Sequence, residues 1–288
     1  MLSMVSIIEA LITGLILGAL YSLASLGLSL VFGVLDVINF AHGDMIMLAS
    51  YIVFLVVMAT GQLWLSLLVS VITFTALGLL LYFGLIHRLI GKEPLIQIAI
   101  TVGLGLVLQN IALALFRAEP KALPTSPFPF GIHIGPVSIS ANRLFVAVIS
   151  VALIAIVQLY LSKTKYGLAS LAVVENREAA WLVGINVPLI YALTFTIGVV
   201  LSAIAGFLWM LIGNVDPYLG VIFGLICWII VALAGLGSVS GILVSGIIVG
   251  LLDGLGSLFL TPSGKYIPIY IAFILTVWLR PRGLFGRR

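Results

Sequence analysis

The sequence predicts an all-α polytopic membrane protein, folded as a single transmembrane domain over residues 1–288 with about eight to nine transmembrane helices. Of its 288 residues, 63% are hydrophobic and only 8% are charged, and the mean hydropathy is +1.36. Soluble domains carry about 25% charged residues, so these charges are too few to cover a surface in water. Several apolar runs also reach the roughly 20 residues that a helix needs to cross a hydrocarbon core.

Hydropathy places the spans between breaks rich in glycine and proline, such as "GKEP" and "TPSGKYIP". The first run has no Lys or Arg before it, so we interpret it as a retained span rather than a cleaved signal. The expected spans are 7–31, 45–58, 64–86, 95–116, 144–161, 188–212, 219–236, 242–260 and 267–279.

The basic residues predict the orientation of these spans, because Lys and Arg accumulate on the cytoplasmic side. One set of loops holds nine: Arg88, Lys92, Lys163, Lys165, Arg177, Arg280, Arg282, Arg287 and Arg288. The opposite set holds four: Arg117, Lys121, Arg143 and Lys265. This places the C-terminus in the cytoplasm and the N-terminus outside, although a broken or re-entrant segment near 36–44 would change the count for the N-terminal half.

The predicted external loop 117–141 contains five prolines and cannot form a regular helix. We expect it to lie across the outer face, with a β-like piece in "IHIGPVSIS". A simple connector is the favoured interpretation, and a docking surface for an external partner is the alternative.

The stretch "INFAHGD", from Ile38 to Asp44, separates the first two apolar runs. Its polar members are Asn39, His42 and Asp44, and we expect Gly43 to permit a turn. One interpretation is a polar turn at the water boundary. The other is a broken helix on a permeation path, where freed backbone groups face a solute. No further ligand cluster accompanies His42 and Asp44, so we expect neither a metal site nor catalysis.

Other polar and small residues within the spans follow helical spacing. Gln97, Thr101 and Gln109, with Gly105 between them, form one stripe that faces protein or water, through interhelical hydrogen bonds or as part of a solute path. We expect this stripe to approach "INFAHGD". Two series of small residues four apart predict close helix packing: Gly14, Gly18 and Ser22, and Gly246, Gly250 and Gly254. The single cysteine, Cys227, excludes an internal disulfide.

The predicted cytoplasmic loop 162–187 is long enough to hold its own helix, which we expect from Leu168 to Val183. Pro188 suits the first turn of the span that follows. Within the loop, "REAAWLVG" holds Glu-Ala-Ala, then three further residues, then a glycine. This pattern resembles the coupling motif of ABC importer permeases, in which a short helix docks on the ATPase subunit; an ordinary amphipathic surface helix is the alternative.

Together with "INFAHGD", "GLGLVLQN", "NVDPYLG", "ALAGLGSVSG" and "RPRGLFG", this loop resembles permeases of the branched-chain amino acid ABC transporters, the Liv type. The likeness runs from about Leu15 to Phe285, although the loop lacks the Ile-x-Leu-Pro tail of other importers. The resemblance assigns ATPase coupling to Glu178, Ala179, Ala180, Gly184 and Asn186, and the translocation path to the region of Asn39, His42, Gly43 and Asp44. It implies a second permease subunit, which a paralogue would provide, two ATP-binding cassette subunits that hold ATP and magnesium, and an external solute-binding protein. It also implies the inner membrane of a prokaryote.

No G-x-x-x-x-G-K-[ST] phosphate loop occurs in the chain, so we expect a non-catalytic subunit that binds no cofactor. We also expect no nucleic-acid partner. The expected function is the membrane path of an importer for branched-chain or related amino acids. The alternative is a self-contained secondary transporter or channel for a small polar solute such as urea, with Asp253 or His42 in ion coupling. An intramembrane enzyme lacks a credible nucleophile. The choice among Leu, Ile, Val, other amino acids and urea stays open.

Overall fold

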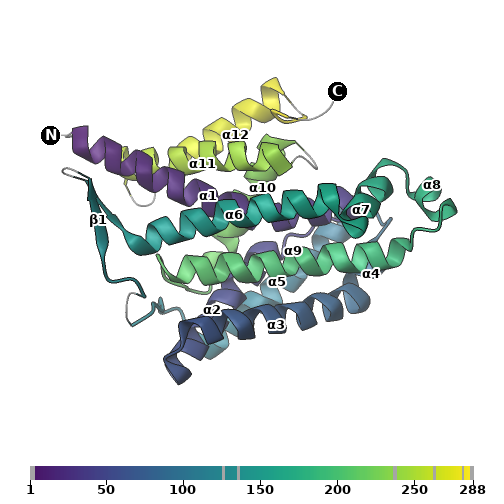
Figure 1. Ribbon diagram of the computed structural model, residues 1–288, viewed down its shortest axis with the longest axis horizontal. Coiled ribbons are helices and arrows are strands. Elements are labelled where there is room, and N and C mark those ends of the chain that lie inside the picture. Colours follow the sequence, from purple (N-terminus) through teal and green to yellow (C-terminus); the bar gives the residue numbers. More distant parts are fainter. Residues whose placement is uncertain are drawn as a thin grey trace.

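The computed structural model describes residues 4–124, 127–134, 137–235, 239–261, 264–280 and 282–285 as an α-helical bundle with one short β-hairpin (Figure 1). Arg287, Arg288 and residues 236–238 of the "ALAGLGSVSG" motif lie outside this description. The elements are α1 (Met4–Leu35), α2 (His42–Thr60), α3 (Leu63–Leu81), the π-helical turn η1 (Tyr82–Ile86), α4 (His87–Leu89), α5 (Pro94–Phe116), β1 (Gly131–Ile134), β2 (Val137–Ser140), α6 (Ala141–Lys163), α7 (Lys165–Glu175), α8 (Arg177–Leu182), α9 (Val187–Met210), α10 (Leu219–Ala234), α11 (Val239–Phe259) and α12 (Ile267–Leu279).

Each predicted span coincides with a helix, so the all-α polytopic prediction is confirmed. Among the described residues, seven helices are long and apolar enough to cross a membrane by length and composition, while α10 and α12 are shorter apolar helices. The N-terminus lies at one end of the long axis and α8 at the other, while the C-terminus lies beside the bundle between them (Figure 1).

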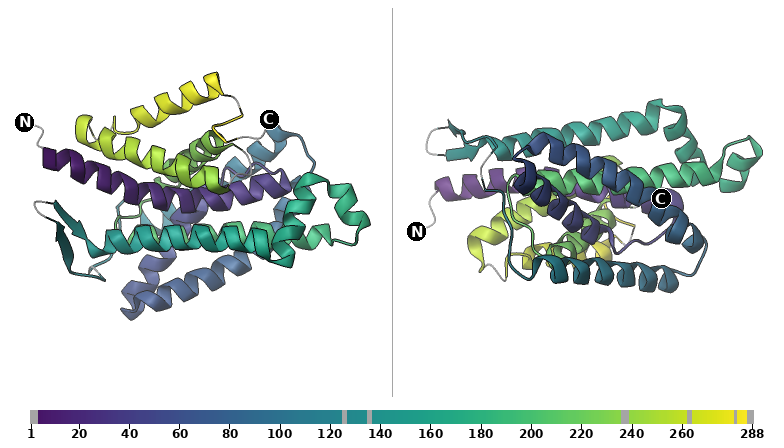
Figure 2. Two further views of the ribbon diagram at one scale, coloured as in Figure 1. Left: turned by 45° about the horizontal axis from the view of Figure 1, so that its top comes forward. Right: turned by 90° about the horizontal axis from the view of Figure 1, so that it is seen from below.

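The first helix, α1, forms the centre of the bundle. It packs against α11, α9, α6 and α10, and nearly all of its residues from Gly18 to Val31 are buried. A helix that is apolar all round suits such a position. Figures 1 and 2 show α11 and α12 on one side of α1, with α9 and then α2 and α3 on the other.

Small residues allow the closest helix contacts. A Cβ atom added to Gly14 would lie 2.7 Å from the Gly250 carbonyl oxygen, and one added to Gly18 would lie 2.8 Å from that of Gly246. The predicted packing role of both small-residue series is therefore confirmed at the α1–α11 interface.

Two connecting segments match the sequence only in part. The predicted β-like piece is an antiparallel hairpin in which Gly131 pairs with Ser140. The stretch from Leu168 to Val183 is helical as expected up to Leu182, but in two pieces: α7 and α8 are separate helices, because Asn176 adopts an extended conformation with φ −157°. Pro188 does lie in the first turn of α9.

Candidate functional site

The backbone between α1 and α2 is unwound and largely buried. Helix α1 ends at Leu35, Asp36 follows with a left-handed φ of 53°, and α2 begins only at His42. Val37, Asn39 and Ala41 have no exposed surface. Non-helical backbone buried in this way needs hydrogen-bond partners from the surrounding protein. The geometry is that of a broken helix pair rather than a turn in water.

Two side chains of α5 provide these partners. The Ile38 amide donates to Gln97 Oε1 over 2.8 Å, and Gln97 Nε2 lies 3.3 Å from the Asp36 carbonyl oxygen. The Phe40 amide donates to Thr101 Oγ1 over 3.2 Å, and that hydroxyl lies 3.1 Å from the Ile38 carbonyl oxygen. The predicted approach of Gln97 and Thr101 to this segment is confirmed.

The far end of the predicted stripe behaves differently. Gln109 lies two turns beyond Thr101, is half-buried, and makes no hydrogen bond to the unwound segment within the described part of the chain. Among the described residues, the side-chain hydrogen bonds from α5 to the break therefore come from Gln97 and Thr101, in the first half of the helix.

Asn39 and His42 bind backbone groups. Asn39 Oδ1 accepts a hydrogen bond from the Ala41 amide at 3.1 Å. His42 Nε2 lies 2.9 Å from the Ala24 carbonyl oxygen of α1. The amide nitrogen of Asn39, Nδ2, and the second ring nitrogen of His42, Nδ1, are buried and have no hydrogen-bond partner among the described residues. Buried polar nitrogens without a partner are uncommon in folded proteins.

The expectation that Gly43 permits a turn is wrong. Gly43 belongs to the first turn of α2 and is not among the glycines with positive φ. Its role is steric, because a Cβ atom there would collide with the Gly220 carbonyl oxygen and the backbone of Gly224 in α10. The left-handed residue at the break is Asp36, with φ 53°.

Asp44 lies between α5 and α10. A Cβ atom on Gly105 or on Gly220 would collide with its carboxylate oxygens, so the two glycines leave the space that the carboxylate occupies. Asp44 is only 8% exposed, and no ion pair involves it among the described residues. An unpaired acid at this depth in an apolar bundle is typical of a functional position.

The second candidate region is the α7–α8 segment, which projects from one end of the bundle (Figure 1). Asn176 caps α8 by accepting a hydrogen bond from the Ala179 amide at 2.9 Å, and Asn186 caps α9 by accepting one from the Leu189 amide at 3.1 Å. Gly184 ends the turn with φ 87°, a conformation that disfavours other L residues.

The coupling candidates occupy different positions in this segment. Ala180 is buried, whereas Glu178, Ala179 and Gly184 are exposed. Beside them, Trp181 is 69% and Leu182 78% exposed. A cavity of about 510 Å³ adjoins this apolar tip and is lined by Arg177, Glu178, Trp181, Leu182, Val187 and Pro188.

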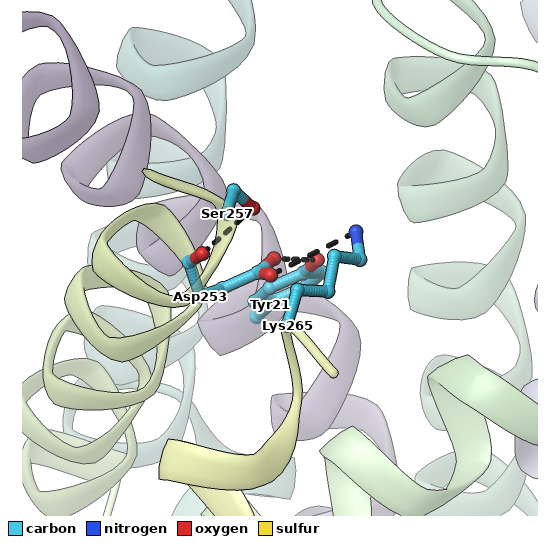
Figure 3. Close-up of polar contacts among 4 residues, drawn as sticks. All are labelled: Tyr21, Asp253, Ser257 and Lys265. Carbon is cyan, nitrogen blue, oxygen red and sulfur yellow. Dashed lines mark hydrogen bonds and ion pairs between the residues drawn. The ribbon is translucent and has the colours of Figure 1, made fainter. Parts of the chain in front are cut away.

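Asp253, the acid considered for ion coupling, is held by other side chains. The Tyr21 hydroxyl donates to its Oδ2 over 2.8 Å, and Lys265 Nζ lies 3.8 Å from its Oδ1 (Figure 3). Asp253 itself is fully buried. The pairing gives it a structural role between α1, α11 and the segment that precedes α12. Within the described residues, no group of three or more His, Cys, Asp or Glu could hold a metal ion.

A bundle of apolar helices, with a buried break between its first two helices and a short helical pair projecting from one end, defines a polytopic membrane protein. Residues 10–277 match the family described as "Branched-chain amino acid transport system / permease component", and the chain belongs to this family.

Relatives from bacteria and an archaeon extend the likeness over nearly the whole chain. It is 29% identical to the high-affinity branched-chain amino acid transport system permease protein BraD of Pseudomonas aeruginosa, over 97% of this chain and 96% of that protein. It is 28% identical to LivH of Escherichia coli, with the same coverage. A probable LivH of Methanocaldococcus jannaschii is 27% identical over 92% of this chain and 88% of its own length. No solved structure matches the chain.

Proposed function

We propose that this chain is the membrane-spanning, non-catalytic permease subunit of an ABC importer, and that it forms the translocation path for branched-chain or related amino acids. The observation that carries the proposal is the family match over residues 10–277. ATP and magnesium are held by two separate ATP-binding cassette subunits, and this chain binds no cofactor. A second permease subunit, contributed by a paralogue, and an external solute-binding protein complete the assembly.

The tip of α7–α8 is the proposed contact with the ATPase. Its exposed Trp181 and Leu182 present an apolar surface beside a cavity, and aromatic side chains at such sites are typical anchors of a protein interface. Glu178, Ala179 and Gly184 lie on the exposed part of this tip, Ala180 packs it onto the bundle, and Asn186 fixes the start of α9.

The break between α1 and α2 is the proposed border of the translocation path. It brings together five buried polar residues from three segments of the bundle: Asn39, His42, Asp44, Gln97 and Thr101. The buried nitrogens of Asn39 and His42 that lack a partner are suited to a transient contact with a polar solute. Gln109 belongs to this path only if the solute follows α5 beyond the break.

The proposed orientation places α7–α8 and the C-terminus in the cytoplasm of a prokaryotic cell. The support is the count of nine basic residues against four in the two sets of loops. Helices α4, α7 and α8 lie together at one end of the molecule, opposite β1 (Figure 1).

Reconstitution of the chain with its ATPase, paralogous permease and binding protein in proteoliposomes tests the proposal. We expect ATP-dependent uptake of labelled leucine, isoleucine or valine that requires every component, measured beside other amino acids and urea. Uptake by this chain alone, driven by an ion gradient without ATP, would refute the proposal and establish a self-contained carrier.

A further inference from the structure

A cavity with polar lining lies at the opposite end of α1 from the break. It has a volume of about 360 Å³ and is bounded by the start of α1, β2, the start of α6 and the end of α11. Its polar lining includes Glu9, Thr13, Ser138, Arg143 and Ser257. Sites for small molecules commonly fall in the range of about 300–1,000 Å³. Glu9 precedes Asp36 by roughly 40 Å along the helix, at 1.5 Å per residue, so this cavity is separate from the proposed path.

The cavity holds one acid and one base that do not pair with each other. Arg143 donates from its guanidinium to Thr13 Oγ1 over 3.1 Å, which directs it from α6 toward α1. Glu9 lies one helical turn before Thr13, on the same face of α1. Across the described residues, neither Glu9 nor Arg143 takes part in an ion pair. Both side chains are exposed, so the cavity is open on this side, and Thr13 holds the guanidinium of Arg143 against α1 without neutralising its charge.

Apolar side chains complete the lining around these two charges. Ile12 and Ile16 of α1 face the cavity together with Leu258 of α11. An occupant that satisfies all of these groups needs an anionic end for Arg143, an ammonium for Glu9 and an aliphatic part for the apolar wall.

We propose that this cavity binds a zwitterion, with its carboxylate or phosphate on Arg143 and its ammonium on Glu9. Two kinds of ligand carry both charged groups: an aliphatic amino acid and the headgroup of an aminophospholipid. Binding of the lipid would go beyond the proposed function. Binding of the amino acid rests on the proposed function and would add a second solute site near the predicted external end.

Binding to the full chain in lipid nanodiscs tests the amino acid source, with leucine as the probe. Two further probes are 4-methylpentanoate, which lacks the ammonium, and isopentylamine, which lacks the carboxylate. We expect Glu9→Gln and Arg143→Gln each to weaken leucine binding about tenfold or more, the effect of losing one charge-assisted hydrogen bond. Glu9→Gln should also abolish the preference for leucine over 4-methylpentanoate, and Arg143→Gln the preference over isopentylamine. The matched controls Glu119→Gln and Arg117→Gln alter exposed charges in the loop after α5 and should change binding less than twofold.

Native mass spectrometry of the same proteins tests the lipid source, using phosphatidylethanolamine against phosphatidylglycerol. If the lipid occupies the cavity, the unaltered chain retains phosphatidylethanolamine preferentially and both charge variants lose that preference, while the two controls keep it. Melting temperatures equal to that of the unaltered chain establish that the variants are folded. The proposal is overturned if neither leucine nor phosphatidylethanolamine binding responds to Glu9→Gln and Arg143→Gln more than to the controls. ATP-dependent uptake by the complete importer is measured separately. If the two charge variants bind both ligands normally and the importer still takes up its solute, the proposed zwitterion site is overturned and the proposed function stands.

Discussion

Replacing Gly43 with alanine tests the contact that closes the break against α10. The added methyl group would collide with the Gly220 carbonyl oxygen and would lie 2.7 Å from the Gly224 Cα atom. These are backbone atoms of a helix, which cannot move aside as a flexible side chain can. Accommodation therefore requires α10 to shift away from the first turn of α2.

The expected size of the effect follows from two opposing contributions. Overpacking at a tight contact costs about 1–3 kcal/mol, whereas alanine in a helix interior gains up to about 1 kcal/mol over glycine. Gly103 in α5 is a matched control, because a Cβ atom there meets nothing within 4 Å. We expect Gly103→Ala to be neutral or slightly stabilising and Gly43→Ala to lower the free energy of unfolding. Because the gain from alanine applies to both helices, the difference between the variants is the overpacking cost, about 1–3 kcal/mol.

Thermal unfolding of the purified chain in detergent measures this difference, and uptake per assembled complex measures its consequence for transport. We expect Gly43→Ala to lower both, because the displaced α10 also carries Gly220, which adjoins Asp44. If the two alanine variants unfold at the same temperature, the close approach of α2 and α10 is wrong. If Gly43→Ala unfolds early but transports normally per complex, the contact is structural and does not border the path.

Three further changes test the coupling segment, the buried ion pair and the orientation. Gly184→Val forces a branched side chain into the left-handed φ of 87°, so we expect lower solute-stimulated ATPase activity with unchanged solute binding by the external protein; intact stimulation would contradict the coupling role. Lys265→Met removes the cationic partner of a fully buried carboxylate and leaves the hydrogen bond from Tyr21. Thermal unfolding should then show a loss of about 1–3 kcal/mol that Lys265→Arg largely avoids, and an unchanged melting temperature in Lys265→Met would show that the pair contributes no stability. In a Cys227→Ala background, Lys163→Cys should resist an impermeant thiol reagent in intact cells while Glu119→Cys reacts, and the reverse labelling would invert the topology.

The helices were predictable because each is a long apolar run between polar or proline-rich breaks. The contact between α5 and the break was also predictable in kind, since Gln97 and Thr101 are polar residues four apart in an apolar helix. Their partners were not, because the sequence carries no signal for which buried backbone groups lack an intrahelical bond. The left-handed conformation of Asp36 was likewise not predictable from the sequence.

Glycine roles were the least predictable part of the site. Gly43 appeared to mark a turn, yet it lies inside a helix and permits contact with a second helix. Gly220 ends the quoted "NVDPYLG" motif, and its close approach to Asp44 depends on a pairing of α2 with α10 across more than 170 residues of sequence. In the same way, the division between α7 and α8 depends on a side-chain cap at Asn176 that competes with continuation of the helix.

Helix α9 joins the two candidate regions. It begins directly after the coupling segment, where Asn186 caps its first turn, and it continues past α1 and α2. A Cβ atom on Gly198 would lie 2.8 Å from the Gly27 carbonyl oxygen of α1, and Ser50 of α2 donates to the Gly206 carbonyl oxygen over 3.2 Å. Contacts this close leave little freedom for α9 to slide independently of either helix, since packed interiors transmit displacement. Within the proposed function, a movement of α8 at the ATPase would therefore reach the helices that flank the break through α9.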